Sequence, residues 1–544
     1  MTGAVWFVPR HRSWVWRFLR PLSKHAFPRP QVTRIDLTDQ ATALPSPAVT
    51  VIGRSIQWVA PVPVTECPPS LPILTPAIEK LLPGPGTYLS WPADLYPFQI
   101  AGVLALIETD RLLLADEMGL GKTVQAIAAI RILWHIGKVR SALIVGRVAI
   151  LVQWRRELEK WAPEIHALII SGSAADRDWQ WRGKQPVKLV SYETLRSESQ
   201  QGRPQLTKDI WGLVVLDEAQ SIKNRDTDVS STVKRVPRTR SWALTGTPLE
   251  NKVDELASVI EFVDGKGGTG SNKKYSDGPE LRDRHQKLQL RRRKKEVLPD
   301  LPEKHTISLQ IGLEAQQRAA YDRAEREGLR RLREGGPDIP ILHVLELITR
   351  LKQICNFEPV TGKSAKLDDL RDRLYSVVRS GSKAVVFSQF TDERYGVAAL
   401  CRELSDFSPL SYTGEMDIET RRQVEDSFRR PDVPLLVVSL RAGGTGLNLQ
   451  HANYVFLFDR WWNPAVEDQA EGRLHRIEQT KEVTVYKYTC LNTIEERIED
   501  ILAAKIRLFK ETVDDVSIDL QRSLTTDDLL KAVGFSLSAQ SVSG

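Results

Sequence analysis

A nine-residue stretch that reads ADEMGLGKT carries residue types that can hold a phosphate group. Gly119 and Gly121 let the backbone approach a phosphate without a Cβ in the way. Lys122 can reach terminal phosphates, and the Thr123 hydroxyl can ligate Mg²⁺. The general phosphate-loop pattern has a glycine where this chain has Asp116, so the pattern is incomplete. The stretch therefore predicts a phosphate loop only in combination with partner motifs elsewhere in the chain.

Acidic and amide side chains supply such partners. In LDEAQ, Asp217 is placed to hold Mg²⁺, and Glu218 is suited to orient or deprotonate an attacking water. Gln220 could pass the state of the nucleotide to neighbouring segments, as could the hydroxyl of Thr245 in TGTP. Upstream of the loop, Gln99 can read an adenine edge, because an amide is both donor and acceptor. Each pattern is common alone, but together they predict a nucleotide site.

Two arginines in the second half of the chain could complete that site. Arg473 and Arg476 are spaced i, i+3, which places them on one helical face. Such a pair is often only a surface feature, but arginines aimed at a nucleotide stabilise transition-state charge by about 4–7 kcal/mol. A basic run, 291–295, reads RRRKK. It is typical of a solvated face, although it could also bind phosphates or brace the two halves.

The elements that must position these residues alternate between buried strands and helices. Continuous Val/Leu/Ile runs fit strands buried on both faces of a parallel sheet, which predicts doubly wound α/β units. The strands are expected at 112–114, 142–146, 187–192, 212–219 and 241–247 in the first half and at 383–390, 434–440, 454–459 and 483–489 in the second. Both the phosphate loop and LDEAQ directly follow a strand, so they can meet at one sheet edge. Residues 313–356 are expected to be helical.

Length and composition indicate a multidomain globular chain. The 544 residues exceed a single core, and 41% hydrophobic and 27% charged content is ordinary. No apolar run reaches the roughly 18–20 residues of a membrane span. The four cysteines lie far apart, which fits reduced thiols. A cytoplasmic location is therefore expected, with nucleoid association if the chain is prokaryotic.

The N-terminal part differs from the rest. Residues 1–90 hold nine Lys or Arg against four Asp or Glu, and 16 of the 31 prolines precede residue 98. The opening mixes arginines and tryptophans. This composition fits either an arm that docks on nucleic acid or a partner, or an extension packed on the body. Residues 50–66 are expected to form one or two short strands.

The order and identity of the motifs resemble the Swi/Snf family of helicase-like ATPases, in helicase superfamily two. The resemblance runs from about Leu95 to about Ile501. Its motifs are LYPFQIAGV, LLLADEMGLGKT, LVSYETL, VVLDEAQSIKN, ALTGTPLENKVDEL, LRRRKKEV, SAKLDDL, KAVVFSQF, SLRAGGTGLNLQ and VFLFDRWWNPAVEDQAEGRLHRIEQ. The segment DRWWNPAVEDQA separates this family from DEAD-box RNA helicases. Asp116 before the glycines is also the family's form.

Three positions depart from the family pattern. Gly146-Arg147 stands where a proline would be usual, Glu478 where glycine is common, and Gln220 where histidine is more frequent. No bromodomain-, chromodomain- or zinc-finger-like segment is evident and the insertion is short, so the chain looks like a compact prokaryotic member.

The resemblance implies a fold and domain boundaries. The expected fold is α/β, with two RecA-like parallel-sheet lobes in tandem, a helical insertion between them and a Pro-rich N-terminal extension. The expected parts are a Pro/Trp-rich basic extension (1–86), lobe 1 (87–264), a linker with the helical insertion (265–365), lobe 2 with a C-terminal helix (366–513) and a tail (514–544).

The resemblance also implies which residues form the sites. The expected catalytic residues are Lys122, Asp217, Glu218, Arg473 and Arg476. ATP would be held by Gln99, Gly119, Leu120, Gly121, Lys122, Thr123 and Gln469, and Mg²⁺ by Thr123 and Asp217. DNA would contact Gln153, Trp154, Ser191, Thr194, Ser388, Gln389, Thr413, Gly443, Gly444 and Thr445.

The function expected from the resemblance is ATP-dependent translocation along double-stranded DNA, without strand separation, to remodel or displace bound protein. ATP and Mg²⁺ are the expected cofactors. A protein partner is expected at the N-terminal extension or the helical insertion, and no membrane. Two alternatives stay open: a strand-separating helicase, and a nucleotide-gated DNA-binding subunit of a larger defence or repair complex.

Overall fold

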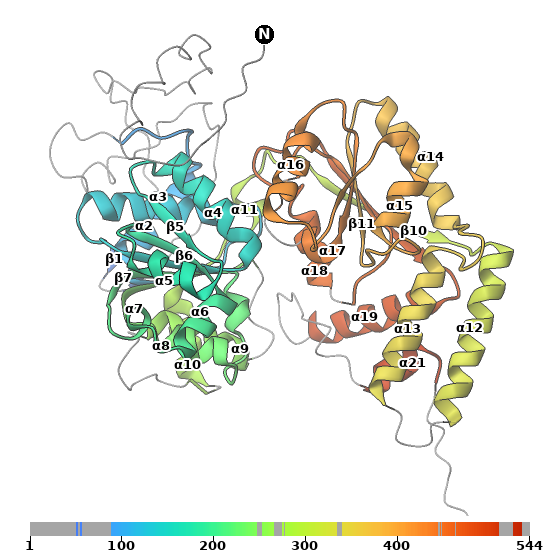
Figure 1. The fold of residues 1–544 in the computed structure, drawn as a ribbon, viewed down its shortest axis with the longest axis horizontal. Coiled ribbons are helices and arrows are strands. Elements are labelled where there is room, and N and C mark those ends of the chain that lie inside the picture. The colour runs from blue at the N-terminus through green and yellow to red at the C-terminus, as the bar shows by residue number, and fades with distance from the viewer. Residues whose placement is uncertain are drawn as a thin grey trace, which may run out of the picture.

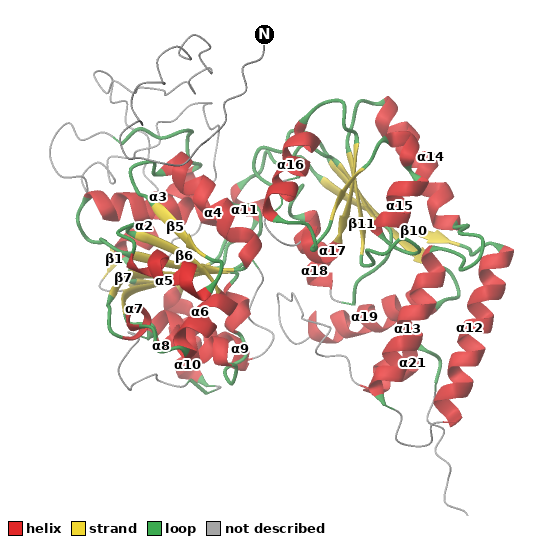
Figure 2. Ribbon diagram, viewed as in Figure 1, coloured by secondary structure: helices red, strands yellow, loops and turns green. Residues whose placement is uncertain are grey.

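Two lobes, each built on a parallel sheet, make up the chain in its computed structural model (Figures 1 and 2). The structure describes residues 51–52, 55–56, 89–246, 253–265, 275–276, 278–334, 340–443, 447, 449–462, 464–510 and 526–535. Most of the expected N-terminal extension and tail therefore lies outside the described residues. Two short strands, β1 (Val51–Ile52) and β2 (Ser55–Ile56), pair antiparallel within 50–66, as predicted.

The first sheet has seven strands in the order β5-β6-β4-β7-β8-β3-β9, and all of its pairs are parallel. Its strands are β3 (Arg111–Leu114), β4 (Ala142–Gly146), β5 (Ala167–Ile170), β6 (Val187–Ser191), β7 (Trp211–Asp217), β8 (Arg238–Leu244) and β9 (Gln289–Leu290). The central strands β4 and β6 are buried throughout, which explains their unbroken apolar sequences. The expected strands of the first half are confirmed within a few residues.

Helices cover both faces of this sheet. One face packs on α2 (Pro97–Glu108), α3 (Lys122–His135) and α4 (Val148–Trp161). The other packs on α5 (Ala174–Arg182), α6 (Tyr192–Gln200), α7 (Pro204–Thr207), α8 (Asp228–Arg235), α9 (Val253–Asp264) and α10 (Pro279–Leu288). Along β3, Leu112 and Leu114 enter the first core and Leu113 enters the second, because side chains alternate along a strand.

The second sheet has six parallel strands in the order β10-β15-β14-β11-β13-β12. They are β10 (Lys304–Ile311), β11 (Ala384–Ser388), β12 (Leu410–Tyr412), β13 (Leu435–Ser439), β14 (Tyr454–Leu457) and β15 (Val483–Cys490). One core packs under α14 (Ala365–Arg379) and α15 (Val397–Glu403). The other includes residues of α16 (Ile418–Arg429), α17 (Leu440–Gly443) and α18 (Pro464–Glu471).

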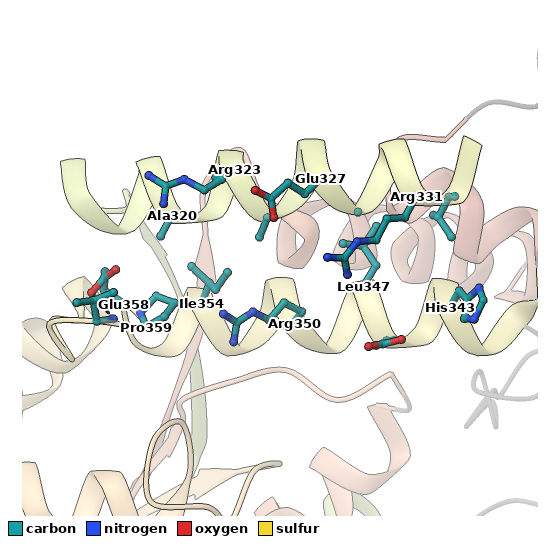
Figure 3. Close-up of a pocket in the computed structure, with 15 residues that line it drawn as sticks. Ala320, Arg323, Glu327, Arg331, His343, Leu347, Arg350, Ile354, Glu358 and Pro359 are labelled. Carbon is teal, nitrogen blue, oxygen red and sulfur yellow. Dashed lines mark hydrogen bonds between the residues drawn. The ribbon is translucent and has the colours of Figure 1, made fainter. Parts of the chain in front are cut away.

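Beside the second sheet lies a helical cluster. Its members α12 (Ala315–Glu334), α13 (Ile341–Asn356), α19 (Ile494–Lys510) and α21 (Thr526–Ala532) share one core, in which Tyr321, Leu351 and Ile494 are buried. Helices α12 and α13 run side by side, and the side chains of both line a cavity of about 690 Å³ (Figure 3). None of the lining residues belongs to the expected ATP site, so this cavity is a separate feature.

The segment expected to link the lobes contributes strands to both sheets. Strand β9 extends the first sheet beside β3, and β10 pairs with β15 over its full length at the edge of the second. The domain boundaries stay predictions, but lobe 2 takes its edge strand from within 265–365. Over the residues that the structure describes, no helix has both the length and the apolar character needed to cross a membrane.

Candidate active site between the two lobes

The phosphate loop lies between the end of β3 and the start of α3. Gly119 has a φ of +87° and Gly121 a φ of +73°, in the left-handed region that glycine adopts without steric cost. Lys122 is the first residue of α3, and its Nζ donates to the carbonyl oxygens of Asp116 at 2.7 Å and Glu117 at 3.2 Å. Burial lowers the pKa of Lys122, against the opposing effect of nearby carboxylates. Thr123 follows in the first turn and is half-buried.

Asp116 is held by an arginine from the segment that joins the lobes. Its fully buried carboxylate accepts from Arg292, with Nε to Oδ1 at 2.9 Å and Nη2 to Oδ2 at 2.5 Å, and from Gln125 Nε2 at 3.2 Å. A bidentate guanidinium fits a carboxylate closely. The residue that replaces the first glycine of the phosphate-loop pattern is thus a structural anchor. The sequence signal for this partner was the basic run 291–295, for which three interpretations were open: a solvated face, phosphate binding and a brace between the two halves.

Gln99 supports the loop from α2. Its Nε2 donates to the carbonyl oxygen of Leu120 at 3.2 Å, and its Oε1 accepts from the backbone N–H of Tyr96 at 3.0 Å. Leu120 is fully buried, which fixes the middle of the loop. A Cβ at Gly121 would lie 2.4 Å from Gln99 Nε2, so this glycine also leaves room for the amide.

The two acidic residues lie at the end of β7, next to Lys122. Asp217 Oδ2 accepts from the indole N–H of Trp154 at 2.7 Å, and Oδ1 accepts from the N–H of Glu218 at 2.9 Å. Burial, together with the charge of Glu218, raises the pKa of Asp217 to about 6. Glu218 has φ +51° and ψ +55°, a left-handed conformation that costs a non-glycine residue about 1–3 kcal/mol and is typical of functional sites.

Glu218 is one point at which the two lobes meet. Within lobe 1 its Oε2 accepts from Gln220 Nε2 at 2.5 Å, and Thr245 Oγ1 donates to Gln220 Oε1 at 3.0 Å. From lobe 2, Gln469 Nε2 donates to Glu218 Oε1 at 3.3 Å, and Arg473 Nη2 lies 3.9 Å from the same oxygen. The carboxylate therefore connects TGTP in lobe 1 with the arginine-bearing segment of lobe 2.

The second arginine lies against the phosphate loop. A Cβ at Gly119 would fall 2.8 Å from Arg476 Cβ, and the N–H of Ile477 donates to the Gly119 carbonyl at 3.4 Å. Burial and the neighbouring Arg473 lower the pKa of Arg476. Its Nε is buried, and the described part of the chain gives it no hydrogen-bond acceptor. A buried cationic donor beside a phosphate loop fits an anionic group between the lobes.

Three of the expected DNA-contact side chains, Trp154, Ser191 and Ser388, are buried and have partners inside the protein, so a contact of these side chains with DNA stays a prediction. Trp154 is fully buried and donates to Asp217, so it belongs to the acidic site. Ser191 is the N-cap of α6, where its Oγ accepts from the N–H of Thr194 at 3.0 Å. Ser388 is fully buried and its Oγ donates to Asp459 at 2.6 Å. In each case the side chain makes a hydrogen bond inside its own lobe.

The other expected DNA contacts stay predictions. Gln153, Thr194, Gln389 and Thr413 are half-buried. Gly443 ends α17 and is buried, and a Cβ there would lie 2.5 Å from the Phe387 ring, so packing alone requires a glycine. Gly444 and Thr445 lie outside the described residues.

One departure from the family pattern has a structural counterpart. Glu478, where glycine is common in the family, has a φ of +76°. Glycine adopts that backbone conformation readily, whereas a glutamate meets a steric cost. Its carboxylate accepts from Gln450 Nε2 at 2.8 Å, which is a contact that glycine could not make.

Comparison with known proteins shows the family to which the chain belongs. The profile of the SNF2-related domain matches residues 2–359, and that of the helicase conserved C-terminal domain matches residues 365–478. The chain therefore belongs to the SNF2-related family of helicase-type ATPases, as its motifs indicated. The match begins at residue 2, whereas the motifs by themselves begin near Leu95.

Bacterial relatives are similar over most of this chain. The uncharacterized ATP-dependent helicase MG018 of Mycoplasma genitalium is 32% identical over 77% of this chain and 42% of its own length. The putative ATP-dependent helicase/translocase YwqA of Bacillus subtilis is 31% identical over 78% of this chain and 49% of its own length. The chain spans less than half the length of these relatives. A solved structure, the Sulfolobus solfataricus SWI2/SNF2 ATPase core in complex with dsDNA, is 29% identical, with 82% of this chain and 98% of that chain covered and a TM-score of 0.37.

Proposed function

We propose that this chain hydrolyses ATP between its two lobes and uses the resulting movement to translocate along double-stranded DNA, displacing or remodelling bound protein. The observation that carries the proposal is the contact of Gln469 and Arg473 of lobe 2 with Glu218 of lobe 1. A carboxylate suited to activate water then lies beside an arginine that enters from the other lobe. This arrangement makes hydrolysis depend on closure of the lobes, which is what a motor needs.

The residues of the site fit Mg-ATP. The phosphate loop with Lys122 would hold the phosphates together with Arg476, whose buried Nε has no hydrogen-bond partner among the described residues, and Thr123 and Asp217 would hold Mg²⁺. A raised pKa at Asp217 fits this role, because a carboxylate crowded by a second one gains most from a nearby cation. Bound Mg²⁺ would neutralise phosphate charge. Glu218 would orient the attacking water, and Arg473 and Arg476 would stabilise the charge that develops during transfer.

Several features support double-stranded DNA as the track. The resemblance of the motifs to the Swi/Snf family implies a duplex track, and a similar Bacillus subtilis protein is named a putative ATP-dependent helicase/translocase. A positive formal charge of +7 favours a polyanion. The half-buried residues Gln153, Thr194, Gln389 and Thr413 are the proposed contacts. Binding to the DNA backbone would be independent of sequence and weakened by salt.

The test is steady-state ATP hydrolysis by the full chain with no nucleic acid, single-stranded DNA, double-stranded DNA or RNA. We expect strong stimulation by duplex DNA and a loss of at least about 100-fold in the Lys122→Ala variant, which lacks the phosphate-binding cation. An unwinding assay with a labelled duplex accompanies it, and we expect no strand separation.

Each other result points to a different function. Stimulation by single strands or RNA only, with unwinding, would replace the translocase by a strand-separating helicase, the activity in the name of the mycoplasma relative. Equal, low hydrolysis in all four conditions, in wild type and Lys122→Ala alike, would contradict a motor and favour a nucleotide-gated binding subunit.

A further inference from the structure

The segment that joins the lobes passes through the site itself. On its lobe 1 side, the N–H of Glu117 donates to the Arg292 carbonyl at 2.9 Å, and the N–H of Lys294 donates to Glu117 Oε2 at 2.8 Å. Glu117 belongs to the phosphate loop, and its carbonyl also accepts from Lys122. The joining segment is thus attached to the loop that carries the phosphate-binding lysine.

The same segment also holds the arginine-bearing loop of lobe 2. Lys294 Nζ donates to the His475 carbonyl at 2.6 Å, between Arg473 and Arg476 in sequence. The His475 ring pairs through Nε2 with the Pro302 carbonyl at 2.8 Å. Lys304 Nζ lies 2.6 Å from Glu471 Oε2, at the end of α18. Three contacts therefore fix the loop that begins after α18 to residues 294–304.

We propose that Lys294 is a positioning residue, which ties the phosphate loop to the arginine-bearing loop and thereby sets where Arg473 and Arg476 stand relative to Lys122. The inference rests on the proposed ATP hydrolysis and assigns a role within that site. Lys294 touches neither acidic residue in any contact described above, so it acts through the backbone of His475 rather than on the reacting atoms.

The environment of Lys294 supports this role. Its side chain is 7% exposed, whereas the adjacent Lys295 is exposed. A buried ammonium is costly unless its donors are used, and Lys294 uses them on loops from two different lobes. Glu117 Oε1, 3.7 Å from its Nζ, supplies the opposing charge. The helix α11 (Lys294–Val297) that begins with this lysine is only one turn long, so its own stability cannot explain the burial.

A pH dependence follows from the same geometry. Burial, with Lys304 and Lys122 nearby, lowers the pKa of Lys294 to about 8, and Glu117 opposes the shift. The ammonium form therefore dominates below about pH 8 and is lost as the pH rises through that value. His475 also faces this lysine, but burial lowers the pKa of its ring, so it is already neutral in this range. Arginine at position 294 would stay charged.

The experiment measures duplex-stimulated ATP hydrolysis by the full chain carrying Lys294→Ala, Lys294→Arg or, as the matched control, Lys295→Ala. In Lys294→Ala we expect kcat to fall by about 10- to 100-fold, because a misplaced arginine loop loses transition-state contacts. KM for ATP should change by less than about threefold, because Lys122 and Gln99 are untouched. Lys294→Arg should have a higher kcat than Lys294→Ala. Its kcat should also stay constant above pH 8, where the kcat of the wild type declines.

Three outcomes would overturn the inference. In the first, the wild type hydrolyses ATP and Lys294→Ala hydrolyses it as fast as Lys295→Ala. That result would overturn the role of Lys294 and leave the proposed function standing. In the second, Lys294→Ala loses kcat and ATP binding equally and has a lowered melting temperature, and Lys294→Arg restores neither. That is the pattern of a purely structural lysine. If the wild type itself hydrolyses no ATP, the proposed function fails first and this inference fails with it.

Discussion

Single side chains in this protein serve functions that their sequence neighbourhood does not show. Trp154 follows a glutamine in a helix and looks like a DNA-contact residue, yet its indole N–H reaches Asp217 63 positions later. Asp116 interrupts a glycine pattern and turns out to be an anchor for Arg292. In both cases a hydrogen bond to a residue far away in the sequence decides the role, and a single sequence does not reveal which distant residue that is. The local features, Gly119, Gly121 and Lys122, were predictable because the loop that they form is local.

Removal of the Trp154 indole N–H should shift the acid side of the pH profile of ATP hydrolysis. The Trp154 hydrogen bond lowers the pKa of Asp217, which burial raises to about 6, so its loss makes protonation easier still. For Trp154→Phe we expect the acid limb of kcat/KM for ATP against pH, which reports the pKa values of the free enzyme, to move up by about one unit, the value of a hydrogen bond to a charged group. Hydrolysis measured at limiting ATP on both sides of pH 6 checks this.

Trp161→Phe is the matched control for this prediction. Trp161 lies on the same helix, is 5% exposed, and its Nε1 has no hydrogen-bond partner within the described ranges. It should lose stability without a change in the pH profile. If both variants shifted the profile equally, packing rather than the indole donor would be responsible.

At the level of elements, the sequence predicted the central strands and missed the edges. Strands β4, β7, β11 and β13 contain continuous apolar runs because both of their faces are covered, and such runs predict buried strands from sequence. The missed strand β10 (KHTISLQI) is mostly exposed and lies at the edge of the second sheet, while β5 and β12 are short and half-buried. An edge strand is defined by the neighbour it pairs with, and its own composition is that of a surface segment.

The elements of lobe 2 are joined by a buried ion pair. Lys366 at the start of α14 donates to Glu495 Oε1 at 2.6 Å, and to the carbonyl of Phe458 at 2.9 Å, with both charged side chains fully buried. Glu495 Oε2 accepts from the N–H of Cys490 at the end of β15. The pair thus fastens α14, β14, β15 and α19 to one another.

Loss of Lys366 should strongly destabilise lobe 2. In Lys366→Met the buried Glu495 carboxylate would lose its hydrogen-bonded ammonium, which costs about 3–5 kcal/mol of unfolding free energy. Urea denaturation followed by circular dichroism measures it. Lys366→Met with Glu495→Gln should recover more than half of the loss. The exposed pair Arg422–Asp426, 3.7 Å apart, is the control: Arg422→Met should cost less than about 1 kcal/mol. Similar costs for both single variants would contradict the proposed importance of the buried pair.

At the scale of the whole molecule, the two lobes stand in close contact over the phosphate loop. Arg476 lies against Gly119, Gln469 reaches Glu218, and Arg156 of α4 lies 3.8 Å from Glu425 of α16. The family motifs predicted that these lobes would share a site. The basic run 291–295 allowed several interpretations, and a brace between the lobes was one of them. The sequence could not decide between them, because the contacts of this segment depend on how the two lobes are placed.

A side chain at position 119 should keep the lobes apart. In Gly119→Ala the new Cβ would meet Arg476 Cβ at 2.8 Å and its Cα at 3.2 Å, so the arginine-bearing loop has to move away. We expect kcat to fall at least about tenfold, and small-angle X-ray scattering with a non-hydrolysable ATP analogue to give a larger radius of gyration than in the wild type.

Gly202→Ala separates this effect from backbone strain. Gly202 has a φ of +69° in the same lobe, and a Cβ there would meet nothing within 4 Å. It should lose about 1–2 kcal/mol of stability, with hydrolysis and dimensions unchanged. Normal dimensions in Gly119→Ala would show that the closed contact of the lobes tolerates a side chain there.

The strands and side chains around the phosphate loop are synthesised at very different times. Strand β3 is the first strand of the large sheet to be synthesised, but both of its neighbours, β8 and β9, come much later. The anchor of Asp116 is 176 residues downstream. At about 5–20 residues per second, a nascent chain would carry the phosphate loop for roughly 10–35 s before Arg292 is made. The phosphate loop is therefore among the last parts of the first sheet to reach its final contacts, and a ribosome-bound fragment that ends before residue 292 should not retain nucleotide.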